Sequence, residues 1–306
     1  MTGYEPSYRA YYHSGRLQSV AESMHTRLYA CNQCPRHCGV DRHVGADGYC
    51  SSSVLPKIAS HTIHHGEEPP ISGKLGSGTI FFSHCTLACR FCQNYPISHF
   101  GNGNVISIAQ LAAMMMELQD KKAHNINFVT PTHSAHTIPA ALLEAVPKGF
   151  NLPIVYNTSG YDDMETLQFL DGVIDIYMPD IKYNNNDTAY AHSDCGDYVE
   201  KNRAALIEMF RQVGLLQCDS HGIALRGMII RHLVIPGGIA ESKECLRFIA
   251  EALSPNITVS IMSQYFPAHT VLHDAVLGRR LHRDEYNEVV EYARSINLEN
   301  ALIQPL

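Results

Sequence analysis

Short apolar runs alternate with amphipathic segments along most of this chain, from about residue 78 onward. Short apolar runs bounded by polar or turn residues are typical of buried strands, and a three- to four-residue apolar spacing is typical of helices. We therefore predict strands at 79–83, 126–130, 153–158, 173–178, 228–235 and 257–264. The helices between and after them are predicted at 107–121, 135–146, 163–170, 197–213, 241–253 and 283–296.

This alternation predicts an α/β protein with a parallel sheet, because continuous apolar strands separated by helices are typical of sheets covered by helices. Six strand–helix units are two fewer than the eight of a closed barrel, so we expect a partial (β/α)6 TIM-like barrel. Ser107 and Gln110 predict a capping box at the start of the first helix. We expect two domains, a small N-terminal cysteine-rich extension at 1–70 and the barrel at 71–306.

Composition narrows the class of protein. The chain has 306 residues, 45% hydrophobic and 17% charged, with a net charge of −7, which argues against a nucleic-acid partner. No apolar stretch is long enough to span a membrane, and the first residues lack the apolar core of a secretion signal. Ten cysteines without such a signal indicate reduced thiols that act as ligands, and we expect the protein in the cytoplasm.

Three closely spaced cysteines follow the first predicted strand. Cys85, Cys89 and Cys92 have the spacing C-x3-C-x2-C, and we call them the mouth cysteines because barrel chemistry occurs where the strands end. Three thiolates hold three irons of a cubane cluster and leave the fourth iron open, whereas an electron-transfer cluster usually takes four cysteines. The alternative is a zinc site completed by His84 or His99.

A second cysteine group lies in the predicted extension. Cys31, Cys34, Cys38 and Cys50, here called the N-terminal cysteines, have the spacing C-x2-C-x3-C-x11-C among many turn residues. Four thiolates in a short polar segment predict a second metal site, because metal binding can order a loop that has little apolar material of its own. Zinc and a second iron–sulfur cluster are both compatible with this pattern.

The mouth cysteines, with an aromatic residue at Phe91, resemble the signature of the radical S-adenosylmethionine (SAM) superfamily. The resemblance covers about residues 78–270 and is closest to the pyruvate formate-lyase activating enzyme group, in a branch with an added N-terminal cysteine motif. It implies a [4Fe-4S] cluster on the mouth cysteines and SAM on the open iron. In that family, reductive cleavage of SAM gives a 5′-deoxyadenosyl radical that abstracts hydrogen from the substrate.

The resemblance also implies which residues bind SAM. Phe91 matches the aromatic residue beside the adenine, and Thr130 and Thr132 occupy the place where many relatives have a Gly-Gly-Glu turn. Asn157 and Ser159 end the third predicted strand.

Asp180 and Lys182 resemble an Asp-x-Lys motif that contacts SAM, and a solvated ion pair is the alternative for these two residues. Arg231 and His232 belong to a segment that resembles the fifth-strand R-x-x-V-x-P-G pattern. The polar segment 183–196 is longer than a routine connection, and we expect a functional loop there.

The resemblance favours an enzyme that activates a glycyl-radical partner, with reduced flavodoxin or ferredoxin as electron donor. One alternative is radical modification of another protein, peptide or metabolite, because a barrel does not select its substrate. A protein of a different class, which binds metal for a structural or redox-sensing purpose without turnover, is the other alternative.

Overall fold

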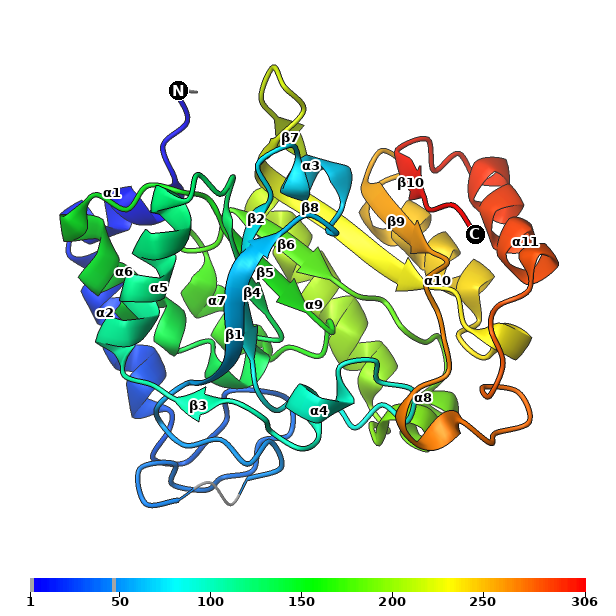
Figure 1. Cartoon of the computed structure of the whole chain (residues 1–306), viewed down its shortest axis with the longest axis horizontal. Coiled ribbons are helices and arrows are strands. Elements are labelled where there is room, and N and C mark those ends of the chain that lie inside the picture. Colours follow the sequence, from blue (N-terminus) through cyan, green and yellow to red (C-terminus); the bar gives the residue numbers. More distant parts are fainter. Residues whose placement is uncertain (1–2, 46–47) are drawn as a thin grey trace.

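A single sheet forms the centre of the molecule (Figure 1). The computed structural model describes residues 3–45 and 48–306. The strand order in this part of the chain is β10-β9-β8-β6-β5-β4-β2-β1-β3, and β7 pairs with β8 outside that order. The parallel strands are β2 (Ser77–Phe82), β4 (Ile126–Val129), β5 (Ile154–Thr158), β6 (Ile176–Pro179), β8 (Ala224–Leu233), β9 (Thr258–Met262) and β10 (Ala301–Ile303). The antiparallel strands are β1 (Lys57–His64), β3 (Asn104–Val105) and β7 (Gln217–Cys218).

The predicted partial barrel is confirmed. Each of the six predicted strands overlaps an observed parallel strand, and the sheet stays open because β10 and β3 lie at its two ends. The sequence reading did not include β10, which adds a parallel strand beside β9, or β1, which pairs antiparallel with β2 over most of its length.

The six predicted helices are also present. They are α5 (Ile108–Asp120), α6 (Thr137–Ala145), α7 (Met164–Leu170), α9 (Tyr198–Val213), α10 (Ser242–Phe248) and α11 (Arg283–Ser295). The capping box is confirmed, because the Gln110 N–H donates to Ser107 Oγ at 3.2 Å and the Ser107 N–H donates to Gln110 Oε1 at 2.8 Å. The last part of the predicted segment 241–253 is a π-helical turn, Ile249–Leu253.

Five short helices were not predicted as such. They are α1 (Ser7–His13), α2 (Arg16–Thr26), α3 (Pro69–Ser72), α4 (Tyr95–Ser98) and α8 (Asn186–Ser193). The expectation of a loop over 183–196 is therefore wrong for its middle part, where the Asn185 side chain accepts hydrogen bonds from the Asp187 and Thr188 N–H groups and caps α8. Asn is a favoured N-cap residue, so this start signal was present in the sequence.

The first two helices share the barrel's main core. Tyr8, Leu17 and Met24 are fully buried in the same apolar cluster as side chains of the parallel strands and their covering helices. The division of the chain at residue 70 stays a prediction, and these contacts show that α1 and α2 pack on the barrel.

The two faces of the sheet carry different clusters. Ile154 and Tyr156 of β5 belong to the cluster that also contains helix residues, whereas Val155 between them belongs to a smaller cluster with Ile71 of α3. Because neighbouring strand residues point to opposite faces, the first cluster lies under the helices and the second fills the inner face near the strand starts.

The inner face becomes polar toward the strand ends. Val155 is followed two residues later by Asn157, Met178 by Asp180, and Ile229 by Arg231. The segments around α4 and α8 and the loop after α2 lie at this end of the sheet, at the lower edge of Figure 1, whereas α3 lies at the opposite end. Among the described residues, no helix combines the length and apolar character that crossing a bilayer requires.

Candidate active site

The mouth cysteines lie in the loop between β2 and α4, at the polar end of the sheet. Their side chains are neither fully buried nor fully exposed. A turn in which the Cys92 N–H donates to the Cys89 carbonyl at 3.1 Å sets the second and third thiols close together. The loop thus presents three soft ligands at the place where the parallel strands end.

Neighbouring groups already donate hydrogen bonds to this set of sulfurs. Ser193 Oγ donates to Cys89 Sγ at 3.0 Å, and Ser98 Oγ lies 3.1 Å from Cys92 Sγ. The Leu87 N–H points at Cys85 Sγ at 3.4 Å. Hydrogen bonds of this kind tune iron–sulfur clusters when they reach the ligating thiolates.

Burial and mutual repulsion raise the pKa of two of these thiols, Cys85 and Cys89. Burial raises the pKa of Cys85 to about 12, and the nearby Cys89 adds to this rise. Burial also raises the pKa of Cys89, which Lys182 partly offsets. Since metals bind the thiolate, iron held by these cysteines would supply the positive charge that favours ionisation.

The mouth cysteines are not arranged around a single ion. No three Cys, His, Asp or Glu side chains in the described ranges are drawn together as ligands of a single ion. A cubane places each thiolate on a different iron, so its ligands lie farther apart than those of one zinc ion. The three mouth cysteines on one loop therefore fit a three-thiolate cluster in their residue type and placement.

A buried charge cluster lies beside the thiols. Lys182 Nζ is 2.5 Å from Asp180 Oδ2, and Arg231 Nη2 is 2.8 Å from Asp180 Oδ1. Burial raises the pKa of Asp180, but the two cations lower it more, so the net shift is below the ordinary value. The alternative of a solvated ion pair is wrong, because Asp180 is only 9% exposed.

Two further residues complete this cluster. Asn157 Oδ1 accepts a hydrogen bond from Arg231 Nη2 at 2.7 Å. Glu67, which was not singled out from the sequence, approaches Arg231 at 3.8 Å from the segment between β1 and α3. Burial raises the pKa of Glu67, and Arg231 opposes that rise. Only the adjacent acidic pair at 67–68 marks this segment in the sequence, and the topology brings it to the strand ends.

Thr130 and Thr132 flank Pro131 but make different contacts. Thr130 has a left-handed backbone with φ of 57°, and its N–H donates to the Asn157 carbonyl at 2.8 Å. Thr132 is buried, and its hydroxyl donates to Asp162 Oδ1 at 2.8 Å. Asp162 also accepts from the hydroxyls of Thr158 and Tyr156, and burial raises its pKa. Asp162 is a buried polar centre that sequence reasoning missed.

The other residues predicted to contact SAM, His232, Phe91 and Ser159, already make contacts within the protein. Both ring nitrogens of His232 are used inside the protein, at 2.7 Å from the Ile181 carbonyl and 2.8 Å from Ser242 Oγ, so neither is free for a cofactor in this arrangement. Burial lowers the pKa of His232 to about 4. Phe91 packs near Tyr265, with ring centroids 5.9 Å apart. The Ser159 carbonyl accepts a hydrogen bond from Tyr198.

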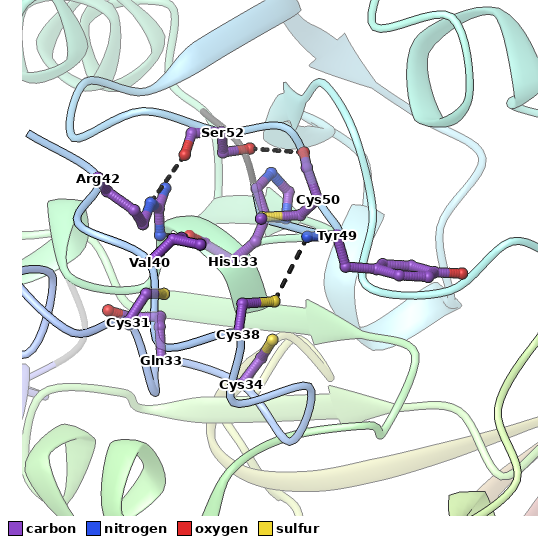
Figure 2. Close-up of a pocket in the computed structure, with 11 residues that line it drawn as sticks. Cys31, Gln33, Cys34, Cys38, Val40, Arg42, Tyr49, Cys50, Ser52 and His133 are labelled. Carbon is purple, nitrogen blue, oxygen red and sulfur yellow. Dashed lines mark hydrogen bonds between the residues drawn. The ribbon is translucent and has the colours of Figure 1, made fainter. Parts of the chain in front are cut away.

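The N-terminal cysteines are also brought together. All four line one small cavity after α2, along with Arg42 and His133 (Figure 2). The three sulfurs of Cys31, Cys34 and Cys38 project from one turn-rich loop, and Cys50 approaches from the next segment of the chain.

Comparisons with known proteins agree with this geometry. A family model described as the radical SAM superfamily matches residues 79–237, which include the mouth cysteines, Asp180 and Arg231. An uncharacterized protein of Methanocaldococcus jannaschii is 28% identical over 278 residues, which are 88% of this chain and 75% of that protein.

Among solved structures, the FeFe-hydrogenase maturase HydG from Carboxydothermus hydrogenoformans is similar, with a TM-score of 0.51 and 13% identity. The superposition covers 74% of this chain and 52% of that protein, so this chain spans about half the length of HydG. At this identity the similarity shows the fold alone. Because the family match covers more than half of its residues, the chain belongs to the radical SAM superfamily.

Proposed function

We propose that this protein cleaves SAM reductively and uses the resulting radical to abstract hydrogen from a substrate. The observation that carries the proposal is the meeting of the mouth cysteines with the buried Asp180–Lys182–Arg231 cluster at one end of the sheet. In this reading the mouth cysteines hold a [4Fe-4S] cluster, which, with SAM, supplies the radical chemistry when bound.

The charged residues suit this cofactor pair. Lys182 lies close enough to Cys89 to favour its thiolate, and it balances part of the negative charge of a thiolate-bound cluster. Asp180 is held by two cations in one orientation, and its carboxylate offers the negative charge that the sulfonium and amino groups of SAM require. Phe91 and Tyr265 supply an apolar, aromatic surface next to the mouth for the adenine.

For the substrate, we infer a glycine residue of a partner enzyme. The support is the sequence resemblance to the pyruvate formate-lyase activating group, in the Asp-x-Lys and R-x-x-V-x-P-G segments. Reduced flavodoxin or ferredoxin is the electron donor in this reading.

The first experiment tests the cleavage of SAM. Anaerobically reconstituted protein is reduced with dithionite in the presence of SAM, and 5′-deoxyadenosine and methionine are measured. We expect both products from wild type and from Cys218→Ser, a control at an exposed cysteine of β7, and neither from Cys92→Ser. Absence of both products from wild type that carries a full cluster would reject the radical-enzyme proposal in favour of a structural or redox-sensing protein.

The second experiment tests the substrate. The reduced protein and SAM are incubated with a glycyl-radical enzyme, and the glycyl radical is sought by electron paramagnetic resonance. A radical on the partner, formed in proportion to 5′-deoxyadenosine, supports activation. Formation of 5′-deoxyadenosine without a radical on any such partner would point to modification of another protein, peptide or metabolite.

A further inference from the structure

The loop that carries the N-terminal cysteines has little regular structure to hold it. The described part of residues 27–56 forms turns and extended segments, and Cys38 is exposed. Backbone bonds at 2.9 Å, from Cys31 N–H to the Val40 carbonyl and from Gly39 N–H to the Cys31 carbonyl, close the loop that carries the first three cysteines. The loop therefore surrounds a small cavity that all four thiols line.

Two buried polar side chains in this cavity lack partners. Gln33 is 1% exposed, and neither of its amide atoms has a hydrogen-bond partner in the described structure. His133, which comes from the barrel after β4, is equally buried, and its Nδ1 also has no partner there. Both residues line the same cavity as the four thiols (Figure 2). Buried polar groups are rarely left unsatisfied, so these atoms indicate a bound group.

The barrel holds one ring nitrogen of His133 and leaves the other without a partner in the described structure. Its Nε2 lies 2.8 Å from the Ser83 carbonyl, so this nitrogen carries the proton and Nδ1 presents a lone pair. Histidines that bind metals typically donate their other ring N–H to a carbonyl or carboxylate in this way. His133 and Cys50 both line the cavity (Figure 2).

Arg42 brings a buried positive charge to this cavity, and a bound group with net negative charge would balance it. Arg42 is 2% exposed and donates to the Ser52, Ser53 and His133 carbonyls at 2.8, 2.6 and 2.7 Å. No carboxylate in the described ranges forms an ion pair with it. A buried charge is costly without an opposite one, and a metal centre with four thiolates carries net negative charge.

We propose that the N-terminal cysteines bind a second metal centre, that His133 contacts it from the barrel through Nδ1, and that Arg42 balances its charge. The centre would tie the N-terminal loop to the barrel just before the mouth cysteines, because His133 also holds Ser83. This proposal does not depend on SAM cleavage, and its test uses a protein without the mouth cluster.

The test starts from the full chain with all three mouth cysteines changed to Ser. We expect this protein to retain about four irons with matching sulfide per chain, measured by elemental analysis, because no three Cys or His side chains in the described ranges are drawn together as ligands of a single ion. About one zinc per chain instead would contradict the cluster that this arrangement favours. A folded protein, by circular dichroism, that retains neither metal after anaerobic reconstitution would overturn the site itself. Adding Cys34→Ser should remove the metal, whereas adding Cys218→Ser should not.

The role of His133 is tested by metal release to a chelator in the same background. We expect His133→Ala to speed release roughly tenfold or more, as is typical when a group that supports a metal site is lost. The matched control is His136→Ala, because His136 is also buried and bonds a carbonyl, that of Val54 at 2.8 Å, but does not line the cavity. Equal release rates from the two variants would contradict contact between His133 and the metal.

Discussion

At the scale of single residues, Asp180 is the clearest case of a side chain whose surroundings decide its role. It lies between two largely buried cations, Lys182 and Arg231, whose side chains are 18% and 16% exposed. We expect Asp180→Asn to lower the free energy of unfolding of the metal-free protein by about 3 kcal/mol, because it leaves these cations without their partner. Urea denaturation at neutral pH measures this change.

The control for Asp180 is an exposed carboxylate. Glu117 forms surface pairs with Lys121 and His61, and such pairs contribute little to stability. Glu117→Gln should therefore leave the denaturation midpoint unchanged. A similar midpoint for wild type and Asp180→Asn would mean that Asp180 is not the anchor of the buried charge cluster.

Ser193 offers a second test, directed at the proposed cluster. Its hydroxyl donates to Cys89 Sγ. A hydrogen bond to a ligating thiolate stabilises the added negative charge of the reduced cluster, so its loss makes reduction less favourable. We expect Ser193→Ala to shift the reduction potential of the cluster by about 20–60 mV to more negative values. Redox titration followed by electron paramagnetic resonance measures the shift. An unchanged potential, as expected for the exposed control Ser19→Ala, would show that the hydrogen bond does not reach a ligand.

The sequence indicated the mouth cysteines and Asp180 because spacing and strand ends are local properties. It did not indicate Ser193 or Glu67, because their partners are far away along the chain: Ser193 contacts Cys89 across 104 positions. Asp162 was missed for a different reason: two of its donors, Thr158 and Tyr156, are near in sequence, but only the fold shows that their hydroxyls meet on one buried carboxylate. His232 was assigned to the cofactor from its motif, and only the fold shows that both ring nitrogens are used internally.

At the scale of elements, periodic segments were predictable and edge segments were not. The helix after Ser107 had both an apolar period and a capping box, and its bounds agree with the prediction within a residue or two. Strand β1 is only partly buried along its length and carries two histidines, so it lacks the apolar run of a central strand. Strand β10 has three residues, too few to show any period.

The hydrogen bonds that attach the start of α1 to the sheet predict that the free energy of unfolding depends on pH. Asp175, just before β6, accepts hydrogen bonds from the Tyr4 hydroxyl and the Ser7 and Ile154 N–H groups. Burial nevertheless raises the pKa of Asp175 to about 6. In the folded protein the Asp175 carboxyl therefore keeps its proton up to about pH 6, whereas in the unfolded chain it releases the proton near pH 4. The proton stabilises the folded state, and this stabilisation is lost as the pH rises through about 6.

We therefore expect the free energy of unfolding of metal-free wild type to contain a contribution that falls by about 1 kcal/mol between pH 5 and pH 7. Asp175→Asn should lack this contribution, whereas the exposed Asp187→Asn should keep it. Urea denaturation of the three proteins at both pH values gives the comparison. Equal slopes for wild type and Asp175→Asn would mean that Asp175 is already ionised at pH 5.

At the scale of the whole molecule, the N-terminal extension and the barrel share their stabilising contacts. Burying Tyr8, Leu17 and Met24 contributes roughly 1.5–3 kcal/mol for each apolar side chain, which together approaches the whole stability of a typical domain. Strand β1 also pairs with β2 from Ile58 to His64, so it completes the sheet beside the strand that leads to the mouth cysteines.

We therefore expect a chain of residues 71–306 alone to lose cooperative folding, although the predicted barrel boundary lies at residue 71. Without residues 1–70, β2 exposes an unpaired edge and the helices under α1 and α2 expose apolar surface, which favours aggregation. Thermal unfolding followed by near-ultraviolet circular dichroism compares this fragment with the full chain, and adding residues 1–70 in trans should restore a transition. A cooperative transition of 71–306 within a few degrees of the full chain would instead make the extension an independent domain.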